Sequence, residues 1–103
     1  MATYQLMCWQ EIPTAVEARE EGGVHKVQLS LRFQELVDLM AMKQGLSGSD
    51  AFMDHWRKSA RQERSGSAAE VAIAVAAEIE ADFDRIRMEA LAASRERKRQ
   101  SGP

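Results

Sequence analysis

Apolar and polar positions alternate with a period of two over residues 3–9, which is typical of a β-strand. Large apolar side chains occur on both faces of this stretch, so we expect an inner strand or one that is covered on both faces. Residues 14–19 and 24–29 repeat the period, and Gly22-Gly23 between them supplies the positive φ that a hairpin turn needs. The pattern therefore predicts a three-stranded antiparallel sheet, with a bend or strand edge at Pro13, which has no N–H to give to a ladder.

Two shorter segments then follow the helical period. Over residues 31–44 the apolar positions lie three and four apart and form one face, and Ser30 is in place to cap the first turn with its hydroxyl. Gly45 suits the end of this helix, with Leu46 folding back on its last turn. A second helix is predicted over residues 48–58, with an apolar stripe made by Phe52, Met53 and Trp56.

The last segment predicts one long helix over residues 68–98. Ser67 and Glu70 have the spacing of a capping box, and apolar residues then recur every three or four positions without an interrupting Pro or Gly. Such a helix is about 45 Å long, whereas a domain of this size is about 26 Å across. We therefore expect the turns after about Ala92 to project into solvent or to reach a partner.

These elements predict an α+β domain. A small sheet needs a cover on one face, and the two shorter helices are its natural cover. The pattern leaves open whether the long helix also packs on the sheet. We expect one domain over residues 1–91, followed by a basic helix end and tail over residues 92–103.

The composition of the 103-residue chain excludes several classes of protein. Fourteen Lys and Arg residues against 16 Asp and Glu residues give a net charge of −2, so there is no overall basic field for nucleic acid. One Cys and two His residues exclude an internal disulfide and a metal site rich in cysteine or histidine. No secretory leader or long apolar run is present, so we expect a cytoplasmic protein.

Few residues are suited to catalysis. His25 and His55 are the only imidazoles and Cys8 is the only thiol, and a small enzyme or a metal site could use them. The competing interpretation places both histidines on polar surfaces and Cys8 inside an apolar strand, because the sequence shows no base or orienting group beside them. On this basis we expect no cofactor and no catalytic or metal-binding residue.

Aromatic, methionine and basic positions are more informative about binding. Tryptophan and arginine are enriched at the centres of protein interfaces, and flexible methionines adapt to a partner. The residues that we predict to bind a partner are Trp9, Met53, Trp56, Arg57, Arg95, Arg97, Lys98 and Arg99. The alternative is that the tryptophans belong to the core and that the basic residues solubilise a frayed helix end.

Several motifs of this chain resemble those of a known family. They are Tyr4-Gln-Leu-Met-Cys-Trp-Gln-Glu-Ile-Pro-Thr-Ala-Val, Val27-Gln-Leu-Ser-Leu-Arg-Phe-Gln-Glu-Leu, Gly45-Leu-Ser-Gly-Ser-Asp-Ala-Phe-Met-Asp-His-Trp and Gly66-Ser-Ala-Ala-Glu-Val-Ala. Their order and spacing are similar to those of the bacterial virulence factor domain family, over residues 3 to about 83. The chain departs from the family at Trp56-Arg57-Lys58-Ser59, where members often read Trp-Arg-Trp-Gly.

The resemblance implies a domain that occurs in longer bacterial proteins linked to virulence and also alone in free-living bacteria. Stand-alone forms resemble products encoded near corrinoid- and folate-dependent methyl-transfer genes. The family brings no established catalytic residue. We therefore expect a non-catalytic accessory or protein-interaction module of a bacterial cytoplasmic complex, its partner an enzyme of one-carbon (methyl-transfer) metabolism.

Two other functions remain open at this point. One is a nucleic-acid-associated regulator that acts through the basic segments 57–64 and 95–99. The other is a small metal-binding protein or enzyme that uses His25, His55 or Cys8. Self-association through the long helix is compatible with each of them.

Overall fold

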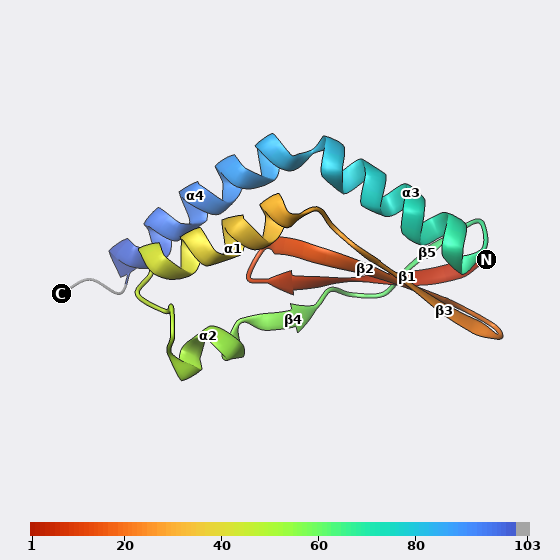
Figure 1. Cartoon of the computed structure of the whole chain (residues 1–103), viewed down its shortest axis with the longest axis horizontal. Coiled ribbons are helices and arrows are strands. Elements are labelled where there is room, and N and C mark those ends of the chain that lie inside the picture. Colours follow the sequence, from red (N-terminus) through yellow and green to blue (C-terminus); the bar gives the residue numbers. More distant parts are fainter. Residues whose placement is uncertain (101–103) are drawn as a thin grey trace.

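A computed structural model describes the backbone of residues 1–100 and the side chains of residues 1–97. In this part of the chain, strands and helices combine into an α+β domain, as expected (Figure 1). The elements are β1 (Ala2–Trp9), β2 (Ile12–Glu20), β3 (Gly23–Gln28), α1 (Leu31–Lys43), α2 (Asp50–Asp54), β4 (Trp56–Lys58), β5 (Gln62–Arg64), α3 (Ala68–Ala81) and α4 (Phe83–Gln100).

The described part of the chain forms one antiparallel sheet of five strands, two more than the alternation predicted. Its order is β3-β2-β1-β4, and β5 also pairs with β1. Trp9 pairs with Trp56 of β4, and Tyr4 pairs with Gln62 of β5, so the two short strands cover opposite ends of one edge. Strand β1 is therefore an inner strand, as its two apolar faces indicated.

The predicted helix over residues 48–58 is wrong beyond its first turns. Helix α2 ends at Asp54, and Trp56 to Lys58 form β4 instead. The backbone of His55 accepts a hydrogen bond from the N–H of Gln10 at 3.0 Å, which brings the chain alongside β1. The segment forms a strand because the free edge of β1 offers backbone hydrogen bonds. The apolar stripe of three residues on which the helix prediction rested contains no information about this edge.

The long helix predicted over residues 68–98 is also corrected, because it is broken at Asp82 into α3 and α4. Its start is confirmed: Ser67 and Glu70 form the complete capping box. Ser30 stands at the N-cap of α1, but its hydroxyl donates to Glu80 of α3 at 2.7 Å and makes no cap hydrogen bond. The end of α1 is as predicted, since the N–H of Leu46 donates to the carbonyl of Ala41 at 2.8 Å.

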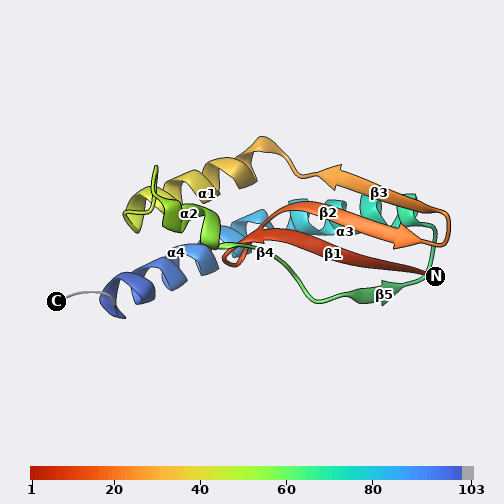
Figure 2. The ribbon, with the colours of Figure 1, turned by 90° about the horizontal axis from the view of Figure 1, so that it is seen from below.

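Three helices cover one face of the sheet (Figures 1 and 2). Helix α3 packs on β1, β2 and β3, and α1 packs on β2 and on α4. The expectation that the two shorter helices provide the cover is thus wrong for α2, which has no buried residue. The largest fully buried side chains of the described core are Trp9, Phe33, Ile12, Met40, Val16, Val37 and Val71.

Helix α4 does not leave the domain after Ala92, contrary to the expectation from its length. Ser94 is buried, and Arg97 forms an ion pair with Glu11 in the β1–β2 turn, with 2.9 Å between Nη2 and Oε2. The bend at Asp82 keeps the second half of the segment on α1. None of the helices in the described residues is long and apolar enough to cross a membrane.

Candidate partner-binding surfaces

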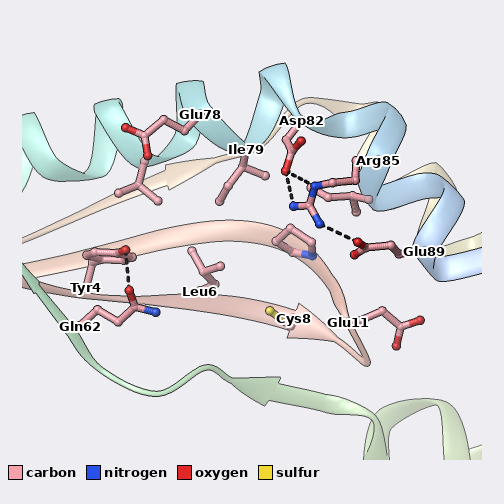
Figure 3. Close-up of a pocket in the computed structure, with 13 residues that line it drawn as sticks. Tyr4, Leu6, Cys8, Glu11, Gln62, Glu78, Ile79, Asp82, Arg85 and Glu89 are labelled. Atoms are coloured by element: carbon pink, nitrogen blue, oxygen red, sulfur yellow. Dashed lines mark hydrogen bonds and ion pairs between the residues drawn. The ribbon is translucent and has the colours of Figure 1, made fainter. Parts of the chain in front are cut away.

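A groove of about 330 Å³ runs between β1 and the two helices above it (Figure 3). Alternation along β1 turns Tyr4, Leu6 and Cys8 toward the helices, where Val75 and Ile79 of α3 face them. Ile86 of α4 and Pro13 of β2 complete the apolar lining. The floor of the groove is therefore suited to an apolar side chain.

The rim of the groove is charged, and its ionic groups are held in ion pairs. Arg85 lies between two carboxylates of α4 and the bend: it contacts Asp82, and its Nη1 donates to Glu89 at 2.8 Å (Figure 3). Glu78 accepts two hydrogen bonds from Arg64 of β5, at 2.6 and 3.0 Å. The Arg85 pairs link α4 to the bend residue, and the Arg64 pair links α3 to the edge strand β5.

The ionisation of the groove residues does not favour proton transfer at neutral pH. Hydrogen bonds from Arg64 lower the pKa of Glu78, and those from Arg85 lower the pKa of Asp82, so both stay ionised. Burial raises the pKa of the Cys8 thiol, and the nearby Arg57 opposes this only in part. Cys8 is thus a protonated thiol in the wall of the groove, which is a poor nucleophile.

The structure keeps the three residues proposed for metal or enzyme chemistry apart. Cys8 is opposite Pro13, whereas His25 is opposite Ala18, five residues further along β2, or about 16 Å at strand spacing. His55 lies at the β1–β2 turn, where its Nδ1 is 3.2 Å from Nε2 of Gln10. Within the described residues, no three His, Cys, Asp or Glu side chains are placed to hold a metal ion together.

A second surface is formed around α2, and we call Met42, Phe52 and Met53 the α2 surface. Met42 and Met53 are 61% and 65% exposed, and Met42 and Phe52 line a hollow of about 420 Å³ between α1 and α2. Trp9 supports this surface from below: its ring stacks on Phe52 at 5.4 Å, and its Nε1 donates to the carbonyl of Phe52 at 2.8 Å. Trp9 is fully buried, so it cannot itself contact a partner here.

The other predicted partner-binding residues are divided among several places. Trp56 is half-buried beside Phe52, while Arg57 is exposed and pairs with Cys8, so it lies on the same face of the sheet as the groove. Arg95 is exposed at the end of α4, next to a small hollow that Lys43 also lines. The side chains of Lys98 and Arg99 lie outside the described residues.

The two basic segments do not merge into one surface. Residues 57–64 follow the edge of β1, whereas residues 95–97 lie in the last turns of α4, at the other end of the molecule from β5 (Figure 1). Lys58 pairs with Glu17 at 3.8 Å, and Arg64 pairs with Glu78. The described side chains of the two segments therefore do not form one continuous basic surface.

Sequence reasoning missed a buried amide cluster at the β1–β2 turn. Gln10 has a φ of 55°, a left-handed conformation that a residue with a side chain rarely adopts. Its amide exchanges hydrogen bonds with Gln44, the C-cap residue of α1, at 2.8 and 3.1 Å, and also contacts His55. Glutamine carries no sequence signal for such a turn, so only the contacts with α1 and His55 identify it.

Comparison with known protein families matches residues 7–92 to the family described as Virulence factor. The match covers most of the chain, so the chain belongs to the virulence factor family. Neither a curated protein nor a solved structure matches it. The family assignment agrees with the motifs in the sequence and assigns no role to the groove or to the α2 surface.

Proposed function

We propose that this member of the virulence factor family is a non-catalytic protein-interaction module, an accessory component of a cytoplasmic bacterial complex. The observation that carries the proposal is the α2 surface, where the exposed Met42 lines a hollow together with Phe52 and the exposed Met53 follows Phe52 on α2. Exposed apolar side chains beside a concave surface are typical of interaction sites, and thioether side chains adapt to different partners. Trp56, half-buried beside this surface, adds an aromatic group of the kind found at interface centres.

The partner that we propose is an enzyme of corrinoid- or folate-dependent methyl transfer. Support comes only from the resemblance to stand-alone family members encoded near genes of that chemistry. The ion-paired carboxylates around the groove and the separation of Cys8 from His25 support an accessory role over a catalytic one.

Site-specific photo-crosslinking in the native host tests the α2 surface. A photoreactive residue at position 42 or 53 should capture the same protein, whereas one at position 88 should not. Met88 is a matched control, because it is 68% exposed but lies on α4, away from α2.

The double variant Met42→Lys and Met53→Lys should lose the captured protein at unchanged thermal stability. Equal capture from positions 42, 53 and 88 would contradict a partner at the α2 surface. Capture of a protein outside methyl-transfer metabolism would leave the surface supported and the partner class wrong.

A further inference from the structure

A single residue, Asp82, separates α3 from α4, yet nothing in the local sequence requires a break. Its φ and ψ are −101° and 11°, and neither Gly nor Pro occurs between Gly66 and Gly102. Good helix formers such as Ala, Glu and Arg predominate on both sides, although Phe83 and Asp84 directly after the bend are weaker ones, and the apolar stripe continues across the bend. Local preference therefore favours one uninterrupted helix over residues 68–100.

Contacts from the start of α1 hold the bend. Nη2 of Arg32 donates to the backbone oxygen of Glu80 at 2.6 Å, the oxygen that an uninterrupted helix would use for the N–H of Asp84. The guanidinium carbon of Arg32 also lies 4.4 Å from the centre of the Phe83 ring, which meets Phe33 edge-on at 5.0 Å. The bend is thus imposed by the tertiary structure.

The bend sets α4 along α1, so that α4 covers one face of α1. Ala90 and Ser94 are buried there, and Nε2 of Gln44 lies 3.4 Å from Oγ of Ser94. If the bend straightened, α4 would leave α1, and the face of α1 that packs on α4 would lose its cover. A second copy, straightened in the same way, carries the one helix that matches this face in shape and chemistry.

We propose that a second copy of this chain is a binding partner, and that two copies exchange α4. In the dimer, α3 and α4 form one straight helix, and α4 of each copy packs on α1 of the other. The α1–α4 contacts of the single chain are then remade between copies, and each straightened segment gains the backbone hydrogen bonds of an uninterrupted helix. The groove is completed between copies as well, since Arg85 and Glu89 on its rim belong to α4.

This exchange is independent of the proposed function, because Met53 lies outside the exchanged segment. A matched pair of variants at the bend tests it. Asp82→Ala and Asp82→Gly both remove the carboxylate that contacts Arg85, and they differ in helix preference. A dimer holds two straightened segments, and each Ala-for-Gly change favours helix by about fivefold, so the dimerisation constants should differ by about 25-fold.

Light scattering across micromolar to millimolar concentrations measures these dimerisation constants. The native chain should dimerise less strongly than the Asp82→Ala variant. The exchange itself is read from a short bismaleimide linker between Gln44→Cys and Ser94→Cys in a Cys8→Ser background. In exchanged dimers this linker joins two chains, whereas in monomers it closes within one chain. Equal constants for the two Asp82 variants, chains that stay monomeric at millimolar concentration, or dimers linked only within each chain would overturn the proposal.

Discussion

Helices α3 and α2 both lie beside β1, but they are held in different ways. Helix α3 buries five residues against the sheet and begins with a complete capping box. Helix α2 has five residues, none of them buried, and its cap residue Ser49 makes no cap hydrogen bond. A helix with its own apolar face and cap is specified locally, whereas α2 depends on the Trp9 side chain beneath it.

The largest test of this difference removes the support under α2. Trp9→Ala deletes a fully buried ring that stacks on Phe52, and we expect it to lower the free energy of unfolding by about 3–5 kcal/mol. Urea unfolding measures this loss, and Trp9→Phe keeps a foldable chain if the alanine variant is too unstable. Trp56→Ala is the control, since this ring is half-buried and should cost less. An equal loss for both variants would show that Trp9 has no special role.

A smaller test compares the two helix starts. Ser67→Ala removes the capping box of α3 and should lower the free energy of unfolding by about 1 kcal/mol. Ser49→Ala removes a hydroxyl that donates to the carbonyl of Leu46 and caps no helix N–H, so its effect should stay below about 0.5 kcal/mol. The two midpoints of thermal unfolding give the comparison directly. A larger loss at Ser49 than at Ser67 would mean that α2 is capped in solution.

The smallest effect at neutral pH is expected at Glu80, which joins α3 to the start of α1. Burial raises its pKa, but hydrogen bonds from Ser30 and Arg32 outweigh burial and leave the pKa below its usual range. The ionised carboxylate therefore stabilises the fold above its unfolded pKa of about 4.3, and this contribution is lost as the pH falls through the lower folded value.

The isosteric variant Glu80→Gln isolates this contribution. It should be slightly less stable than the native chain at pH 7, and the difference should shrink toward zero as the pH falls below about 4. Unfolding free energies measured from pH 7 to pH 3 check the sign. A difference that grows in acid would contradict the assigned direction.

The residues of the candidate surfaces could be predicted from the sequence only where the hydrophobic pattern indicates directly whether a side chain is exposed or buried. Met53 is exposed, while Trp9, which was predicted to bind a partner for a similar reason, is fully buried. An apolar stripe in the sequence does not distinguish a side chain buried between a helix and the sheet from one exposed on the outer face of the helix. The sequence does not reveal the groove, because its walls come from β1, α3 and α4 and its rim depends on pairs such as Arg64 with Glu78.

By itself, the sequence determined the features that depend on neighbours a few residues apart. The period of two marked β1, β2 and β3, the spacing of Ser67 and Glu70 marked the start of α3, and Gly45 marked the end of α1. Each rests on hydrogen bonds or side-chain faces within one strand, turn or helix.

Only the tertiary structure decided the bend at Asp82 and the strand at Trp56–Lys58. The helix bends because Arg32, 48 residues away in the chain, binds the carbonyl of Glu80. The strand forms because the edge of β1 offers backbone partners to a segment with a helical pattern. In both places a contact between distant segments outweighs a local preference that amounts to a few tenths of a kcal/mol per residue.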